Sequence, residues 1–150
     1  AELEEAMLAA QAECDILVQC AAVADFTPKT VSAGKIKKTP ADTMVLELTK
    51  NPDILAELAQ NRRPGQLVVG FAAETGTPTE VAQLGKEKAR RKGADLLVIN
   101  QVGDTAGFGD VDTTITLVDA KGQQLGSAQG PKDVVARAVV EEISTLASKC

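Results

Sequence analysis

Histidine, tryptophan and tyrosine are absent from this sequence of 150 residues, and aromatic residues make up only 2% of it. Without histidine, the chain cannot build a Ser-His-Asp site, a Cys-His site or a His-ligated metal site from its own residues. Any chemistry therefore depends on lysine, aspartate, asparagine and backbone groups. The scarcity of aromatic residues also predicts an aliphatic core, which is typical of a parallel sheet covered by helices.

Long hydrophobic runs and a basic balance of charge are lacking as well. No apolar run approaches the roughly 20 residues of a membrane span, and no signal peptide opens the sequence, so we expect a soluble protein with no membrane partner. The net charge of −5 argues against nucleic acid as a partner, because a polyanion favours basic surfaces. Cys14, Cys20 and Cys150 form neither a CxxC pair nor a disulfide framework, so a reduced, cytoplasmic compartment is expected.

Apolar segments alternate with amphipathic segments along the chain. Because 44% of the residues are hydrophobic, one core is expected, and residues 1–150 are predicted to form a single domain. Amphipathic helices are predicted at 1–13, 51–61, 77–93 and 130–149. Strands are predicted at 15–24, 43–50, 66–75 and 94–101, with a hairpin at 113–129 that turns at Lys121 and Gly122.

Two of the helices carry start signals. Asn51 is expected as the N-cap of one, with Pro52 at its first helical position. The next helix has Thr77 as N-cap and Glu80 three residues later, which is the spacing of a capping box, and Gly93 ends it. Strands that alternate with such helices predict an α/β protein with a doubly wound, mostly parallel sheet, followed by a C-terminal hairpin and helix.

A ligand is expected at the carboxyl ends of the predicted strands, because doubly wound sheets bind their ligands outside that edge. The segments AVADFTP, GFAAETG and NQVGDTAGFGDVD follow the three buried strands and are rich in Gly, Asn, Asp and Thr. Asp25, in the first segment, can accept from ribose hydroxyls or an exocyclic amine, or can serve only as a turn or cap residue. KNPDI at 50–54 can offer backbone N–H groups to a ligand or be only a helix start.

Two groups of lysines accompany these segments. Lys35, Lys37 and Lys38 lie on a long irregular segment, which is typical either of a functional loop or of a solvated one. Lys88 and Lys92 are four residues apart and share a helix face, which by itself is more typical of ordinary surface lysines. Their coincidence with acceptor-rich loops predicts a pocket for a polyphosphate. Neither a Walker A motif nor GxGxxG is present, so a common ATPase site or a standard dinucleotide site is not supported.

Five motifs in order resemble one known family. They are AAVADFTP, KIKK at 35–38, KNPDI, VVGFAAET and NQVGDTAGFGDVD, and the resemblance runs from about residue 14 to the end. Together they resemble phosphopantothenate-cysteine ligase, the synthetase half of the bacterial bifunctional coenzyme A biosynthesis protein. The resemblance implies a Rossmann-like fold and, in the full protein, fusion to a flavin-dependent phosphopantothenoylcysteine decarboxylase domain.

The resemblance also implies an activity. CTP would activate the carboxylate of 4'-phosphopantothenate as an acyl-cytidylate with release of pyrophosphate, and L-cysteine would then displace CMP. Mg2+ would accompany the triphosphate. Lys88 and Lys92 would hold phosphates, and a flap with the catalytic residues Lys35 and Lys38 would close over the acyl-nucleotide. The residues implied to bind the nucleotide are Ala21, Asp25, Lys35, Asn51, Pro52, Asp53, Ile54, Phe71, Lys88 and Lys92.

The sequence departs from the family's pattern at two places. The family's first strand and its Gly- and Thr-rich loop have no counterpart before Ala1, so we expect a fragment without its N-terminal βα portion, and the fragment alone need not be active. Asp112 stands where asparagine is expected. A noncatalytic nucleotide-binding or assembly module and an NADP-dependent reductase-like domain remain as alternatives. The alternating TMVLEL segment is a candidate for pairing in a homodimer.

Overall fold

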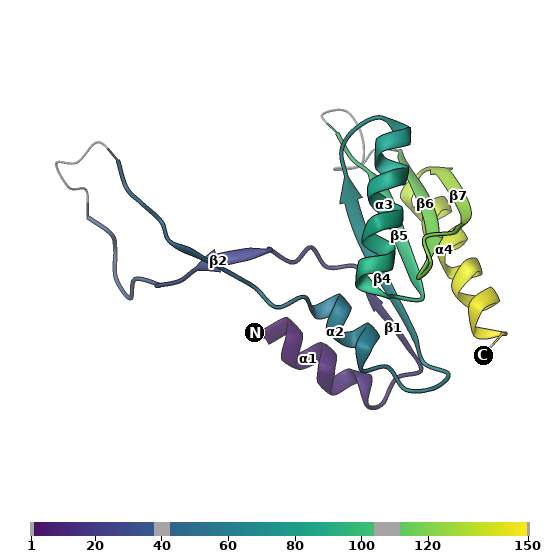
Figure 1. Ribbon diagram of the computed structural model, residues 1–150, viewed down its shortest axis with the longest axis horizontal. Coiled ribbons are helices and arrows are strands. Elements are labelled where there is room, and N and C mark those ends of the chain that lie inside the picture. Colours follow the sequence, from purple (N-terminus) through teal and green to yellow (C-terminus); the bar gives the residue numbers. More distant parts are fainter. Residues whose placement is uncertain (1, 38–42, 104–111, 150) are drawn as a thin grey trace. The chain divides into compact units, whose positions relative to one another are not determined.

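The computed structural model describes residues 2–37, 43–103 and 112–149 (Figure 1). The chain divides into two compact units. The first comprises Ala1–Ala21 and Ile54–Cys150, and the second comprises Ala22–Asp53. Each unit has a sheet of its own. Of the helices that the described residues form, none combines the length and the apolar character needed to cross a membrane.

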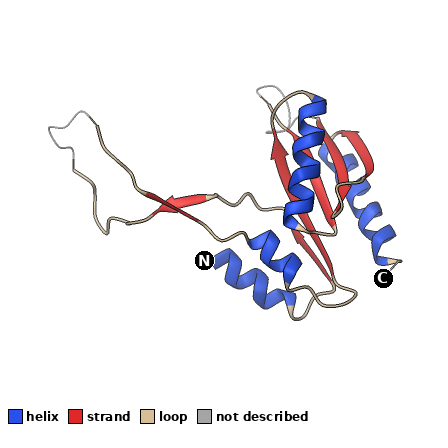
Figure 2. Ribbon diagram, in the orientation of Figure 1, coloured by secondary structure: helices blue, strands red, loops and turns tan. Residues whose placement is uncertain are grey.

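A five-stranded sheet forms the centre of the first unit (Figure 2). Neighbouring strands β1, β4 and β5 are parallel, whereas β6 is antiparallel to both β5 and β7, so four of the five strands run in one direction. The predicted α/β architecture, with a mostly parallel sheet and a C-terminal hairpin, is confirmed. In spatial order the strands are β1 (Ile16–Gln19), β4 (Leu67–Glu74), β5 (Leu96–Gln101), β6 (Thr113–Asp119) and β7 (Gln124–Gly130).

Helices cover both faces of this sheet. Side chains on a strand alternate between the two faces, and the buried residues accordingly form two clusters. In one cluster, Val68 and Leu97 pack with α2 and α3, and α1 lies against the same cluster through Met7 and Leu8. In the other, Val69 packs with α4. The helices are α1 (Glu2–Gln11), α2 (Ile54–Gln60), α3 (Pro78–Lys92) and α4 (Lys132–Ala147).

The ends of α3 follow from the sequence. Glu80 donates its backbone N–H to the Thr77 hydroxyl, and its carboxylate accepts from the Thr77 backbone N–H at 2.9 Å, which completes the predicted capping box. These hydrogen bonds lower the pKa of the Glu80 carboxyl below its ordinary value, the bond from the backbone contributing most. Gly93 ends the helix at φ 69°, a left-handed conformation that glycine adopts without strain.

Other predicted boundaries are wrong for reasons that lie outside the local sequence. β1 ends at Gln19 and not near Ala24, because β4 pairs with it only as far as Gly70. The sequence predicts an apolar stripe on the last helix through Val134, Ala138 and Ile143. On α4 the buried residues are Val135, Val139 and Ile143, so Ile143 is confirmed and the first two positions are wrong by one residue. The start of α4 directly after Pro131 agrees with the sequence.

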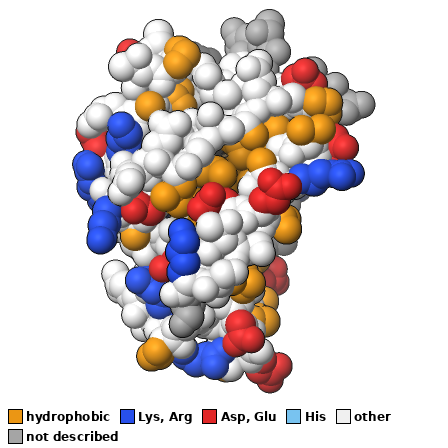
Figure 3. All heavy atoms as spheres, turned by 90° about the vertical axis from the view of Figure 1, so that its right-hand side faces the viewer, with side chains coloured by type: hydrophobic (Ala, Val, Ile, Leu, Met, Phe, Trp, Pro, Cys, Tyr) orange, Lys and Arg blue, Asp and Glu red, His pale blue; other side chains and the backbone are white. Residues whose placement is uncertain are grey.

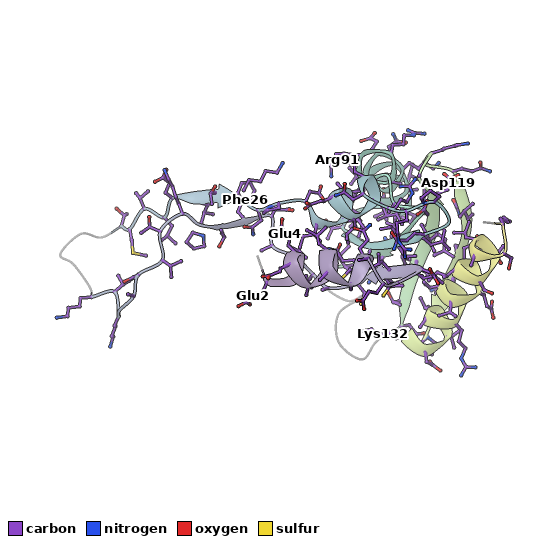
Figure 4. The ribbon with its side chains drawn as sticks, turned by 90° about the horizontal axis from the view of Figure 1, so that it is seen from below. Glu2, Glu4, Phe26, Arg91, Asp119 and Lys132 are labelled. Atoms are coloured by element: carbon purple, nitrogen blue, oxygen red, sulfur yellow. The ribbon has the colours of Figure 1, made fainter. Side chains whose placement is uncertain are left out.

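The second unit contains a two-stranded antiparallel sheet. β2 (Phe26–Pro28) pairs with β3 (Leu48–Lys50), with Phe26 opposite Lys50. Every residue of the two strands is exposed, including Phe26 at 57% (Figure 4). The prediction of a strand over 43–50 with only one exposed face is therefore wrong in part, because only Leu48–Lys50 form a strand and all three residues are exposed. Met44, Val45 and Leu46 precede β3 and are exposed as well.

Candidate functional site

The carboxyl ends of β1, β4 and β5 lie at one edge of the first unit's sheet, as parallel pairing requires. β4 extends beyond β1, because Gln19 pairs with Gly70 whereas β4 continues to Glu74, opposite Gln101 of β5. Ala21 lies two residues after the end of β1 and is exposed. At the predicted ligand edge, β4 and β5 therefore extend further than β1.

Glu74 and Lys88 form an ion pair at this edge. Glu74 Oε1 lies 2.5 Å from Lys88 Nζ, and the two side chains are 15% and 30% exposed. Glu74 is the last residue of β4 and Lys88 lies in the second half of α3, so the pair joins the strand to the helix that covers it. The structure thus brings one predicted phosphate-binding lysine to the carboxyl edge of the sheet.

The close approach of α3 to the sheet depends on Gly85. A Cβ atom at this position would overlap Cδ1 of Ile99, which lies beside Ala72 in the neighbouring strand. Only glycine allows the helix backbone to lie against Ile99, and Lys88 follows one turn later. Lys92 is the last residue of α3 and is half-buried. Its spacing from Lys88 puts both lysines on one face of the helix, as expected.

Phe71 and Ile54 do not present their side chains beside Glu74 and Lys88. Phe71 is 39% exposed, but its side chain points to the opposite face of β4 from Glu74, because the two residues are an odd number of positions apart. Ile54 is 5% exposed and packs in the core of the first unit. For Ile54, therefore, only backbone groups are available to a ligand.

In the second unit, two predicted site segments are hydrogen-bonded to each other. The backbone N–H of Asn51 donates to the carbonyl oxygen of Asp25 at 2.8 Å, and Asn51 Nδ2 donates to the carbonyl oxygen of Ala24 at 2.7 Å. Asn51 is therefore not the N-cap of α2, which begins three residues later at Ile54. Its side chain is used as a donor, which an N-cap side chain is not. The N-cap prediction, and with it Pro52 as the first helical residue, is wrong.

The other predicted residues of the second unit are exposed. They are Asp25, Lys35, Lys37, Pro52 and Asp53. Lys38 and the whole segment 104–111, which contains GFGD, lie outside the described residues. The convergence of the three predicted loops at one edge of the sheet stays a prediction.

Charged groups of both signs are mixed on the surface. Figure 3 shows one face of the molecule, on which lysine and arginine side chains are interspersed with aspartate and glutamate. This face carries no broad basic field (Figure 3). No group of three or more acidic or cysteine side chains within the described residues is arranged to hold a metal ion.

Sequence reasoning missed Glu74 and Gly85. Glu74 ends a strand and precedes Lys88 by fourteen positions, so neither residue falls in the other's local pattern. A lysine-rich helix that follows an acidic strand end is, on its own, only a weak indication of an ion pair between them. Gly85 lies within a helical pattern, where glycine is unfavourable, and this is a signal of close packing.

The fold defines a doubly wound α/β protein with a lysine at the carboxyl edge of its sheet. A family model described as the DNA/pantothenate metabolism flavoprotein C-terminal domain matches residues 1–146. The chain therefore belongs to this family. Its membership confirms the resemblance that the five sequence motifs indicate.

Curated relatives extend well beyond the matched region. The coenzyme A biosynthesis bifunctional protein CoaBC of Mycobacterium tuberculosis is 41% identical over 143 residues, which cover 91% of this chain and 34% of the relative. The protein of the same name from Bacillus subtilis is 37% identical over 150 residues, covering 99% and 36%. The chain thus spans about a third of the length of these relatives.

Solved structures share the fold at lower identity. The DNA/pantothenate metabolism flavoprotein from Streptococcus pneumoniae has a TM-score of 0.75 at 20% identity and covers 96% of this chain and 69% of its own. A Cab2 mutant in complex with phosphopantothenate-cysteine has a TM-score of 0.60 at 16% identity and covers 85% of this chain and 42% of its own.

Proposed function

We propose that this chain is part of a phosphopantothenate-cysteine ligase that acts in coenzyme A biosynthesis. The observation that carries the proposal is the family match over residues 1–146, within which the five motifs occur in order. Relatives named for coenzyme A biosynthesis support it. A protein of similar fold in complex with phosphopantothenate-cysteine supports the choice of product.

The proposed reaction has two steps. A carboxylate oxygen of 4'-phosphopantothenate attacks the α-phosphorus of CTP, the bond from that phosphorus to the oxygen bridging to the β-phosphorus breaks, and pyrophosphate leaves. The amine of L-cysteine then attacks the acyl carbon of the acyl-cytidylate, loses a proton and displaces CMP. Negative charge shifts onto phosphate oxygens in both steps, and positioned cations stabilise that charge.

In this proposal the two groups of lysines have different roles. Lys88, held at the carboxyl edge by Glu74, and Lys92 on the same face of α3 bind the phosphates of CTP. Lys35 and Lys38 close over the acyl-nucleotide and stabilise the charge that develops during transfer. The exposed position of Lys35 leaves its ammonium able to reach a bound nucleotide without breaking the fold.

The nucleoside contacts come from the other proposed residues. Asn51 donates one hydrogen bond to Asp25 and one to Ala24, so the two segments lie close enough for one ligand to contact both. Asp25 offers a carboxylate to the ribose or to the exocyclic amine of cytosine. The remaining proposed contacts are Ala21, Pro52, Asp53, Ile54 and Phe71.

Magnesium is proposed as the companion of CTP. Mg2+ in nucleotide sites usually retains several waters and binds the substrate phosphates and only one or two carboxylates, so a dedicated cluster is not required. The described residues contain no such cluster, and Glu74 is engaged by Lys88. The proposal therefore assigns no protein ligand to the ion.

The test of the proposed function is made on the full-length protein. We expect phosphopantothenate and cysteine to be joined with release of one pyrophosphate per product when CTP is supplied, and CTP to bind more tightly than ATP in calorimetry. Equal or tighter binding of ATP would contradict the choice of nucleotide. Nucleotide binding without pyrophosphate release would favour the noncatalytic module instead, and a spectral change with NADPH would favour the reductase-like domain.

The proposed assembly is a homodimer formed through the second unit. An isolated two-stranded sheet is marginally stable in water, and this one exposes Met44, Val45 and Leu46 at 63%, 91% and 59% beside it. A second copy of the same segment would bury these side chains and extend the sheet. We further propose a cytoplasmic location and fusion to a flavin-dependent phosphopantothenoylcysteine decarboxylase domain, in line with the bifunctional relatives.

A further inference from the structure

Glu74 is fixed in place by its backbone as well as by its ion pair. Its carbonyl oxygen accepts from the N–H of Val102 at 2.9 Å, and the adjoining Gln101 donates from Nε2 to the carbonyl oxygen of Gly76 at 3.0 Å. The turn after β4 is thereby tied to the end of β5. The carboxylate of Glu74 consequently stands at a defined point of the ligand edge, 2.5 Å from the Lys88 ammonium.

The ion pair is better shielded from water than an ordinary surface pair. Lys29 and Glu47 in the second unit form a pair of similar length, but their side chains are 59% and 70% exposed, whereas Lys88 and Glu74 are 30% and 15% exposed. Charges that are partly buried interact more strongly and are less screened by salt. The charge of Lys88 is therefore largely compensated before any phosphate arrives.

A phosphate that binds Lys88 must share the ammonium with Glu74 or displace it. The ammonium has three donors, so sharing is geometrically possible. The carboxylate then lies next to the bound phosphate, and the two negative groups repel each other. Glu74 therefore opposes the binding of every phosphate that Lys88 attracts.

We propose that Glu74 lowers the affinity of the Lys88 site for phosphate and so favours the release of pyrophosphate. The inference rests on the proposed function, since it requires Lys88 to contact phosphate. In the empty protein the carboxylate takes the place of the phosphate on Lys88. During turnover it repels the pyrophosphate formed in the first step.

The test is a double-mutant cycle in the full-length protein. Inorganic pyrophosphate is titrated by calorimetry into wild type, Glu74→Gln, Lys88→Ala and the double variant. Glutamine keeps an oxygen that can accept from Lys88 and removes only the charge. We expect Glu74→Gln to bind pyrophosphate at least about fivefold more tightly, the effect of one unit charge at about 4 Å in a water-like dielectric. The gain should vanish when Lys88 is alanine, because the two residues act through one contact.

Two controls distinguish a specific effect of Glu74→Gln on pyrophosphate affinity from a change in net charge and from a loss of folding. Glu141→Gln makes the same change of charge on an exposed residue of α4, whose helix covers the other face of the sheet, and should leave pyrophosphate affinity unchanged. The melting temperature of each variant is measured alongside. With Glu74→Gln, turnover at saturating substrate should fall as pyrophosphate release slows, and added pyrophosphate should inhibit more strongly.

The outcomes distinguish this inference from the proposed function. If wild type makes phosphopantothenoylcysteine but Glu74→Gln binds pyrophosphate no more tightly, or if the gain persists with Lys88→Ala, the role of Glu74 is overturned and the ligase function stands. If the predicted cycle is observed in a protein that forms no product, the ligase function is overturned and the role of Glu74 stands. If neither wild type nor Glu74→Gln binds pyrophosphate, the role of Glu74 is overturned, and product formation alone decides the ligase function.

Discussion

Lys88 is the predicted phosphate ligand whose surroundings are defined best, and it supports a quantitative expectation. Lys88→Ala should weaken CTP binding by about 1.5 to 3 kcal/mol, the usual contribution of a hydrogen bond to a charged group. CMP, which lacks the β- and γ-phosphates, should lose much less. Calorimetry with both nucleotides measures the difference. Arg91→Ala removes the same charge from an exposed position of α3 (Figure 4) and is the matched control.

Equal losses for CTP and CMP would show that Lys88 acts through the fold and not through the distal phosphates. The same measurement applies to Lys92→Ala, for which the shared helix face predicts a loss in the same direction. High salt should reduce both effects if the phosphates remain open to solvent.

Lys35 is expected to separate catalysis from stability. An exposed lysine on a loop usually changes the free energy of unfolding by less than about 0.5 kcal/mol when it is replaced, and Lys35 is exposed. Lys35→Ala should therefore leave the melting temperature near that of wild type while turnover of phosphopantothenate with cysteine falls. Lys121→Ala, at the exposed turn between β6 and β7, should change neither quantity. Unchanged turnover in Lys35→Ala would identify Lys35 as a solvated loop residue.

At the scale of the element, the close packing of α3 against the sheet depends on one glycine. Gly85→Ala would place a methyl group into Ile99, and overpacking of this kind typically costs about 1 to 3 kcal/mol. Chemical denaturation of the variant measures the cost. Gly126→Ala is the matched control within the same sheet, because its added Cβ would meet only Leu117 Cδ1 at an ordinary 3.8 Å. An equal loss in both variants would mean that the close approach at Gly85 is not the cause.

The start of α3 should respond to acid in a defined direction. The pKa of Glu80 is lowered in the folded protein by hydrogen bonds from Thr77, so the ionised carboxylate stabilises the fold. A group with a depressed pKa contributes fully above its unfolded pKa and loses the contribution as pH falls through the folded pKa. Glu80→Ala should thus be less stable than wild type at neutral pH, and the difference should shrink below pH 4.5, the ordinary pKa. A difference that stays constant into acid would rule out the carboxylate as the cause.

At the scale of the whole molecule, the exposed apolar segment before β3 should control assembly. Val45 is 91% exposed, and a charge at this position would be buried without a partner in the proposed dimer. Val45→Asp should therefore shift the protein from dimer to monomer in sedimentation analysis. Val140→Asp, at a 64% exposed position of α4, should leave the assembly unchanged. A wild type that sediments as a monomer would contradict the proposed homodimer.

The sequence by itself determined most of the elements of the first unit and the family. The capping box at Thr77 and Glu80, the glycine stop at Gly93 and the hairpin turn at Lys121 and Gly122 are local patterns, so they could be recognised without knowing what packs against them. The five motifs are likewise local, and the family match agrees with them. The cap, the glycine stop and the turn depend on hydrogen bonds between residues that are close in the sequence.

Only the tertiary structure decided which residues meet. β1 ends at Gln19, where its pairing with β4 stops although β4 continues to Glu74. Val135 is buried in place of Val134 because the sheet selects the face of α4. Asn51 was expected to cap a helix, but its side chain is hydrogen-bonded to Ala24, which is distant in the sequence. The Glu74–Lys88 pair arises in the same way. Contacts between distant segments depend on how elements pack, and no local pattern of residues encodes that.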